Sequence, residues 1–180
     1  MRKLPDQTVA VRLVRPDDAA TMSRLLTDNA DFLAPYEPER PASFASPDGQ
    51  AGEIARSLER HDAGSAYPGA IVLDGVLVGR INLSNIVRGA ANYADLGYWV
   101  ARSANGRGVA TLAVRDILVL AFGPLALHRV QAATLVDNVA SQRVLVHNGF
   151  ERIGLARRYL RIAGRWQDHV LFQRLVNDNE

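Results

Sequence analysis

Residues 105–111 read NGRGVAT, a short run with the composition of a loop that binds phosphate. Gly106 and Gly108 flank Arg107, and glycine lets the backbone turn sharply and lets a ligand approach closely. The apolar stretch that follows is too long for a strand and is expected to be a helix. The unpaired N–H groups and the dipole at the start of such a helix favour an anion. We therefore expect the backbone from Gly106 to Thr111 to bind a phosphate or pyrophosphate.

Two common phosphate loops do not fit this run. A P-loop ends in Gly-Lys-Ser/Thr, and that triplet is absent. A dinucleotide fingerprint needs a third glycine where Thr111 stands, and an acidic residue about 20 positions later. His128 and Arg129 occupy the latter place. Taken alone, the run could equally be an ordinary turn, so the remainder of the chain has to decide.

The composition is that of an ordinary globular protein and excludes several classes of site. The 180 residues are 48% hydrophobic and 22% charged, which fits one domain spanning residues 1–180. A net charge of +2 is too weak to suggest nucleic acid as the main partner. The absence of cysteine excludes disulfides and thiolate ligands, and the four histidines lack metal-ligand spacing, so we expect no metal. No apolar run could span a membrane and no signal peptide is evident, so a cytoplasmic protein is expected.

Hydrophobic periodicity and turn signals predict an alternation of strands and helices. The hairpin signals are Asp74-Gly75 and Ala163-Gly164. Asp17 or Asp18 is expected to cap the first helix, and residues 34–49 to form a loop or short helical turns. The remaining expected elements are strands at 8–15, 66–85 (two strands), 93–101, 128–136 and 150–175 (two strands), and helices at 15–26, 50–61, 107–122 and 138–148. This order predicts a single-domain α/β fold with a mixed sheet and helices on both faces.

Two motifs in the second half of the chain resemble those of the GCN5-related N-acetyltransferases (GNAT). NGRGVATLAV is similar to their acetyl-CoA loop, usually written Q/R-x-x-G-x-G/A. NVASQRVLVHNGF, at 138–150, resembles their second motif, N-x-x-S/A followed by a helix and Gly-Phe. The two motifs together are far more specific than either alone. The loop positions that match are Asn105, Gly106, Arg107, Gly108, Val109 and Ala110, with Asn105 standing where Gln or Arg is usual.

Four further stretches narrow the resemblance to ribosomal-protein alanine N-acetyltransferases of the RimJ/RimL type. They are FLAPYEPERP, INLSNIVRGA, LGYWVA and YLRIAGRWQDHVLF. The similarity runs from about Val9 to Leu175. It implies the GNAT fold, with a mostly antiparallel sheet and a splay between the strand ending near Ala101 and the one beginning near Arg129.

The resemblance also implies how acetyl-CoA binds. The backbone of Trp99, Val100 and Ala101 is expected to pair with the pantetheine arm, and Asn138 to contact it. The N–H groups from Gly106 to Thr111 are expected to hold the pyrophosphate. Family members usually stabilise the oxyanion with a backbone N–H at the position of Val100.

Two residues carry the expected chemistry. Ser141 is the candidate to hydrogen-bond or protonate the leaving sulfur, because Leu145 stands where many members carry a tyrosine. Asp95 stands where many relatives carry the glutamate that acts as base, and its shorter side chain could act through water. Loss of a proton at pH 7 costs about 1.2 kcal/mol for an α-amine and about 4.6 kcal/mol for lysine. A weak base of this kind therefore suits an N-terminal amine.

The acceptor side is expected to involve Tyr36, Glu37, Asn82 and Tyr159. Glu37 or Glu39 could recognise an ammonium, although either could be a solvated loop acid, and Tyr36 could simply pack. Tyr98 and Trp99 are expected to pack on the faces of the sheet rather than touch substrate, and the histidine of Asp-His-Val at 168–170 is expected to be structural.

Three functions remain open on the sequence. The first is acetylation of a protein N-terminus, and the second is acetylation of a small amine such as an amino sugar, a polyamine or an antibiotic. The third, an acyl-CoA sensor without catalysis, is disfavoured by the intact loop and Ser141. Membrane and direct nucleic-acid partners are not expected, and the sequence leaves open whether the protein is a monomer or a homodimer.

Overall fold

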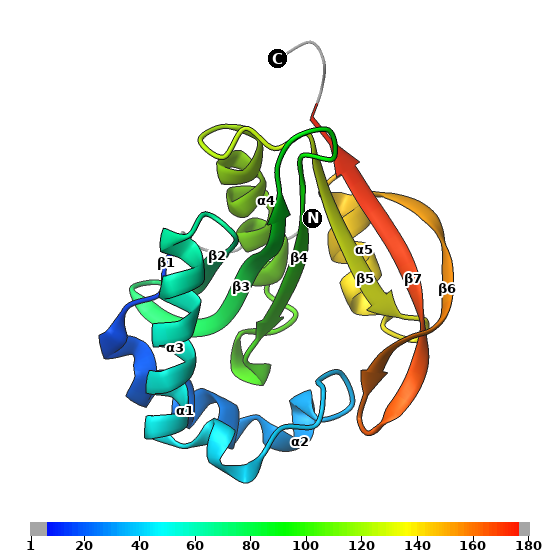
Figure 1. Ribbon diagram of the computed structural model, residues 1–180. Coiled ribbons are helices and arrows are strands. Elements are labelled where there is room, and N and C mark those ends of the chain that lie inside the picture. Colours follow the sequence, from blue (N-terminus) through cyan, green and yellow to red (C-terminus); the bar gives the residue numbers. More distant parts are fainter. Residues whose placement is uncertain (1–6, 177–180) are drawn as a thin grey trace.

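A computed structural model describes residues 7–176, in which seven strands form one twisted sheet (Figure 1). The order across the sheet is β1-β2-β3-β4-β5-β7-β6, and only the pair β4–β5 is parallel. This confirms the mixed, mostly antiparallel sheet. The strands are β1 (Val9–Leu13), β2 (Tyr67–Leu73), β3 (Val76–Val87), β4 (Tyr93–Val100), β5 (Arg129–Leu135), β6 (Glu151–Ile162) and β7 (Arg165–Leu175).

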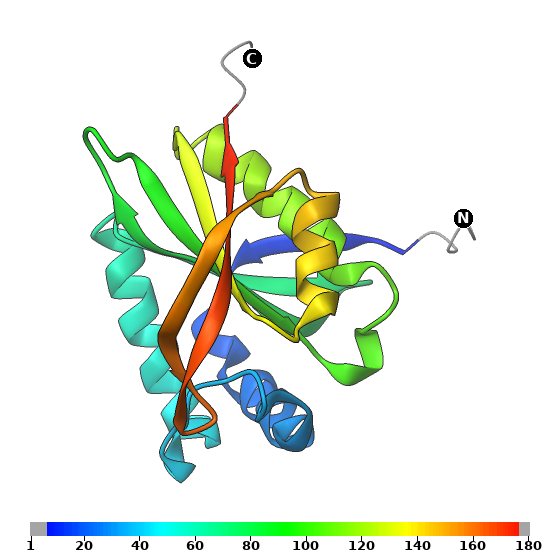
Figure 2. The same ribbon diagram turned by 90° about the vertical axis from the view of Figure 1, so that its right-hand side faces the viewer.

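Helices cover both faces of the sheet, as the sequence predicts (Figures 1 and 2). One face carries α1 (Ala19–Asp28) and α3 (Pro47–Asp62), and the other carries α4 (Val109–Phe122) and α5 (Val139–His147). The short elements are α2 (Ala30–Leu33) and the 3-10 helices η1 (Pro16–Asp18), η2 (Ala42–Ala45) and η3 (Arg102–Ala104). None of the helices within residues 7–176 combines the length and apolarity needed to cross a membrane.

A separate apolar core lies on each face of the sheet. On the α4 face, Ile117 of α4 packs with Ile81 of β3, and both side chains are fully buried. On the α1 and α3 face, Met22 and Ile54 pack over Ala70. Each large apolar side chain buried in this way stabilises the fold by about 1.5–3 kcal/mol. The two cores clamp the central strands from both sides and so fix the backbone that carries the site.

Local turn signals behave as the sequence predicts. Asp74 and Gly75, with φ of 50° and 83°, link β2 to β3, and Ala163 and Gly164, with φ of 47° and 75°, link β6 to β7. Positive φ at both turn residues is the geometry that matches the twist of a tight hairpin.

Two helix starts differ from the expectation. Helix α3 begins at Pro47 rather than Gln50, because Ser46 caps it by accepting the N–H of Gly49 at 3.0 Å. Asp18 stands at the N-cap of α1 but makes no cap bond there. Its carboxylate instead accepts two bonds from Arg12, at 2.7 Å each, and the Arg15 N–H at 2.8 Å. The strong guanidinium partner holds the pKa of Asp18 below its usual range.

The expected splay between the two central strands is confirmed. Strands β4 and β5 pair only from Tyr93 to Leu96 and from Arg129 to Ala132. Beyond these residues the two strands diverge (Figure 1). The second half of β4 therefore has a neighbouring strand on one side only.

Candidate active site

The free edge of β4 presents a small set of backbone groups to the splay. The Ala101 N–H donates to the Val78 oxygen at 2.8 Å, so the peptide groups of Ala101 and Trp99 face β3. Peptide groups alternate along a strand, so those of Val100 and Tyr98 face β5, where the pairing has already ended. The Ala101 oxygen also accepts the Ala104 N–H at 2.9 Å. The backbone groups left to pair with a ligand at this edge are therefore those of Val100 and Tyr98.

A pocket of about 370 Å³, the splay pocket, opens between the diverging strands. Thr134 of β5 is buried in its wall, and the Thr134 hydroxyl has no hydrogen-bond partner within residues 7–176. A polar ligand would satisfy this hydroxyl. Other lining residues include Tyr36, Glu37, Leu96, Gly97, Tyr98, Trp99, Val100, Asn105, Ala110, Ala132, Ala133, Leu135, Asn138, Ser141, Leu145 and His169.

The glycine loop lies at the start of α4 with open space above it. Gly106 and Gly108 have φ of 71° and 77°, and a Cβ added at either would meet no atom within 4 Å. Gly108 occupies the N-cap of α4 and offers no side-chain cap, and the first helical bond is from the Leu112 N–H to the Gly108 oxygen. The N–H groups of Val109, Ala110 and Thr111 therefore remain available, which fits a phosphate group above the loop.

The Asn105 side chain bonds to the backbone of this loop. Its side-chain oxygen accepts the Gly106 N–H at 3.3 Å, and the residue also lines the splay pocket. Arg107, between the two glycines, is half-buried. The residue that departs from the family pattern thus bonds the loop backbone.

Two hydroxyl groups meet inside the splay pocket. Asn138 caps α5 by accepting the Ser141 N–H at 3.1 Å, which holds Ser141 in the first turn of the helix. The Tyr98 hydroxyl lies 2.8 Å from Ser141 Oγ. Burial raises the pKa of Tyr98 to about 12, so the phenol stays protonated at neutral pH. Tyr98 therefore does more than pack on the sheet, and the long-range contact with α5 had no local signal in the sequence.

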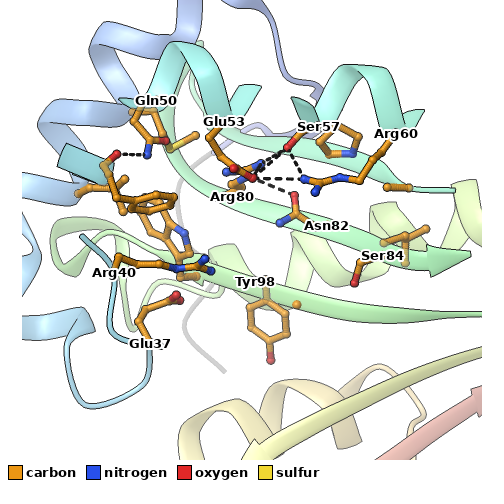
Figure 3. A pocket seen from close by; sticks show the side chains of 18 of the residues that line it. Glu37, Arg40, Gln50, Glu53, Ser57, Arg60, Arg80, Asn82, Ser84 and Tyr98 are labelled. Carbon is orange, nitrogen blue, oxygen red and sulfur yellow. Dashed lines mark hydrogen bonds and ion pairs between the residues drawn. The ribbon is translucent and has the colours of Figure 1, made fainter. Parts of the chain in front are cut away.

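A second pocket, of about 560 Å³, lies on the opposite face of the sheet beneath α3, and we call it the α3 pocket (Figure 3). It shares Glu37 and residues 97–99 with the splay pocket, so the two pockets adjoin at the end of β4. Asn82 lies in its floor and accepts a bond from Arg80 Nε at 3.3 Å. The lining is rich in charge and includes Glu37, Arg40, Gln50, Glu53, Ser57, Arg60, Arg80, Ser84 and Asn85.

The loop after α2 closes against the tip of the β6–β7 hairpin. The Ala163 N–H donates to the Glu37 oxygen at 3.0 Å, and the Glu39 side chain lies against Gly164. The Glu37 side chain lines both pockets, and burial raises the pKa of its carboxyl above the usual range. Tyr36 lines the splay pocket while remaining 45% exposed.

Two of the residues expected to act in catalysis or acceptor binding, Asp95 and Tyr159, line neither pocket. The Asp95 carboxylate accepts a bond from Asn85 Nδ2 at 2.8 Å, and Asn85 itself lines the α3 pocket. Asp95 therefore stands directly behind the pocket wall. Tyr159 is 47% exposed and meets the His169 ring edge-on, with 5.8 Å between the ring centres. His169, which the sequence suggests is structural, is buried and reaches the wall of the splay pocket.

Across residues 7–176, no cluster of three or more acidic or histidine side chains could hold a metal ion.

Residues 9–151 match the family model of the acetyltransferase (GNAT) domain. The probable N-acetyltransferase YjcK of Bacillus subtilis is 34% identical over 98% of this chain and 99% of its own length. The ribosomal protein uS5-alanine N-acetyltransferase of Escherichia coli is 34% identical over 94% of this chain and 88% of its own length.

A solved structure with the same fold is that of Mycobacterium smegmatis RimJ in complex with CoA-disulfide. It superposes with a TM-score of 0.91 at 34% identity and covers 93% of this chain and 82% of the other. The uncapped start of α4, the unpaired edge of β4 and the buried Thr134 hydroxyl all fit an extended ligand with a diphosphate at one end. The chain therefore belongs to the GNAT family and is an acetyl-CoA-dependent N-acetyltransferase.

Proposed function

We propose that the protein transfers an acetyl group to the N-terminal α-amine of a protein, with an alanine of a ribosomal protein as the preferred acceptor. The observation that carries this proposal is the bond from the Ala163 N–H to the Glu37 oxygen. It joins the loop after α2 to the β6–β7 hairpin beside the junction of the two pockets. A slender, flexible chain end can enter past such a closure more easily than a lysine on a folded surface. The names of the Escherichia coli and Mycobacterium smegmatis relatives support the same class of acceptor, which would place the reaction in the cytoplasm.

On the donor side, the described residues suit the parts of acetyl-CoA in order. The N–H groups of Val109, Ala110 and Thr111 would hold the pyrophosphate, and each charge-assisted bond is worth about 1.5–3 kcal/mol. The Val100 oxygen would pair with the pantetheine arm, and the Thr134 hydroxyl would gain a partner. The Asn138 side-chain oxygen is engaged in the helix cap, so its amide NH₂ is the group left to contact that arm.

The transfer forms a C–N bond to the amine and breaks the C–S bond of the thioester. The Val100 N–H is the proposed donor to the oxyanion, a role worth about 2.7–4 kcal/mol for a single donor in other enzymes. Ser141 and Tyr98 would stabilise the leaving sulfur. Proton transfer from a phenol of pKa about 12 to a thiolate of pKa about 8.5 would be uphill by about 4.8 kcal/mol. The pair therefore acts by hydrogen bonding, and the proton released by the attacking nitrogen supplies the thiol through solvent.

On the acceptor side, Glu37 would bind the ammonium form of the amine, since its carboxylate borders both pockets. Asp95 remains our proposal for the proton acceptor, acting through water past Asn85. An α-amine loses its proton at pH 7 at a cost of about 1.2 kcal/mol, against about 4.6 kcal/mol for lysine. A base that acts through water is therefore sufficient for an α-amine and poorly suited to lysine.

Release of thiol from acetyl-CoA tests the proposal. Alanine-starting peptides should support turnover with a higher kcat/KM than amino sugars, polyamines or aminoglycoside-type amines. Faster turnover with a small amine would favour the alternative enzyme. Tight acetyl-CoA binding with no turnover on any acceptor would favour a sensor.

A further inference from the structure

Arg80 is a buried cation in the floor of the α3 pocket. The residue is 8% exposed on β3, Nη2 donates to Ser57 Oγ at 3.0 Å, and Nε donates to Asn82 Oδ1 at 3.3 Å (Figure 3). Both of these partners are neutral. The nearest carboxylate oxygen, Glu53 Oε1, lies 3.9 Å from Nη2 and is beyond hydrogen-bond distance. A buried charge with this set of partners is incompletely compensated.

Glu53 supplies only part of the compensation, because its carboxylate is shared with other partners. Its carboxylate accepts bonds from Arg56 at 3.0 Å and Arg60 at 3.3 Å, and from the Ser57 hydroxyl at 3.2 Å. Burial is the largest influence on Arg80 and lowers the pKa of its guanidinium; Arg60 and Arg40 also lower this pKa, whereas Glu53 and Glu37 raise it. Three arginines and two glutamates line the α3 pocket: Arg40, Arg60 and Arg80 against Glu37 and Glu53.

The same pocket offers a hydrogen-bond acceptor as well as a cation. Gln50 is fully buried and donates from Nε2 to the Phe44 oxygen at 2.6 Å. Its Oε1 has no partner among residues 7–176. Across the pocket, Arg40 lies over the Phe44 ring, with 4.9 Å from Cζ to the ring centre. A ligand that carries both an anion and an N–H group would satisfy this lining.

Arg80 lies one strand away from the β4 residues that border the splay pocket. Arg80 is paired with Trp99, and Asn82 with Gly97, in the β3–β4 register. Residues 97–99 also border the splay pocket. Neighbouring strands lie about 4.8 Å apart, and an extended peptide advances about 3.3 Å per residue. A group bound by Arg80 would therefore belong to the acceptor, about one or two residues beyond the one that carries the reactive amine.

We propose that the α3 pocket is an anion subsite of the acceptor, in which Arg80 binds a carboxylate on the second or third residue of the N-terminus. This inference rests on the proposed N-terminal acetylation and names the substrate class within it: N-termini with an acidic second or third residue. A small amine that carries a carboxylate or phosphate would present the same chemistry.

The test is a charge preference, measured as the ratio of two kcat/KM values. One peptide starts Ala-Ala-Glu and its partner Ala-Ala-Gln, with a second pair that places Glu or Gln at the second position. The wild-type ratio of acidic to neutral peptide should be about 10 or more for at least one pair. Arg80→Gln should bring that ratio close to one. Arg24→Gln, which removes the same charge from the exposed side of α1, should keep the wild-type ratio.

Arg40→Gln provides a second test that does not disturb a buried residue. Arg40 is exposed beside the pocket, and its loss should lower the charge preference by a smaller factor than Arg80→Gln. A matched pair of small amines, one with a carboxylate and one with the corresponding amide, separates small-molecule acceptors from peptides.

The outcomes distinguish the subsite from the function on which it rests. Equal kcat/KM for acidic and neutral peptides, with good turnover of both, overturns the anion subsite and leaves N-terminal acetylation intact. An acidic preference that Arg80→Gln and Arg40→Gln leave unchanged also overturns it. Turnover of small amines alone overturns N-terminal acetylation, and the subsite then stands only if the carboxylate-bearing amine is preferred.

Discussion

The Tyr98 hydroxyl lies 2.8 Å from Ser141 Oγ, a contact that joins β4 to the first turn of α5 across the splay. Ser141→Ala and Tyr98→Phe should each lower kcat, by roughly 10- to 1,000-fold for Ser141. Because the two hydroxyls act together, the double variant should lose little more than the worse single variant. Tyr93→Phe, which changes a β4 tyrosine that lines neither pocket, is the control. Fully additive losses would show that the two groups work independently.

Gly108→Val should abolish acetyl-CoA binding, measured by calorimetry. Its side chain would enter the open space above the loop at φ of 77°, where the pyrophosphate is proposed to lie. Gly89→Val is a close control, because Gly89 has the same φ of 77° and equally open surroundings in the β3–β4 turn. Equal affinity for the two variants would contradict the role of the loop.

Glu37→Gln should raise KM for the acceptor by about 10- to 100-fold at neutral pH, since it removes a charge-assisted bond to the ammonium. Burial raises the pKa of Glu37, so the wild-type carboxylate is lost at a higher pH than an ordinary glutamate as the pH falls. The difference in KM between the wild type and Glu37→Gln should therefore shrink as the pH falls. Glu39→Gln, which changes an acid that lines neither pocket, should leave KM near the wild-type value. An unchanged KM in Glu37→Gln would place ammonium binding elsewhere.

Asp95→Asn should flatten the rising limb of the pH–rate profile of kcat/KM, because the proposed proton acceptor is then gone. Its partner variant, Asn85→Ala, should retain that limb while releasing the carboxylate from its bond. A wild-type profile for Asp95→Asn, together with an altered one for Glu37→Gln, would move proton removal to Glu37.

Features that depend on local chemistry could be predicted from the sequence. Asp74-Gly75 makes a hairpin because Asp and Gly tolerate positive φ at the two turn positions, and at Ala163-Gly164 the glycine supplies this tolerance at the second position. The glycines of the loop and Asn138 at the start of α5 follow the same logic of turns and caps. The order of elements, and with it the α/β fold and the splay, followed from hydrophobic periodicity and the family motifs.

Features that depend on packing between distant segments could not be predicted from the sequence. Tyr98 and Ser141 are 43 positions apart, and only the packing of α5 beside β4 brings their hydroxyls together. The contact of the Asp95 carboxylate with the Asn85 amide had no local signal either, because it depends on a register shift between β3 and β4 after Ser84. Arg80 had no motif at all, because its significance lies in burial beside a shared Glu53.

The most direct test of N-terminal acetylation is the site of transfer within one acceptor. An alanine-starting peptide with an internal lysine would be incubated with the enzyme and acetyl-CoA, and the acetylated nitrogen identified by fragment mass spectrometry. The lower cost of deprotonation alone favours the α-amine by about 300-fold at pH 7, so acetylation should be confined to that nitrogen. Acetyl groups on the lysine, or none on the peptide while a small amine is consumed, would contradict the proposed function.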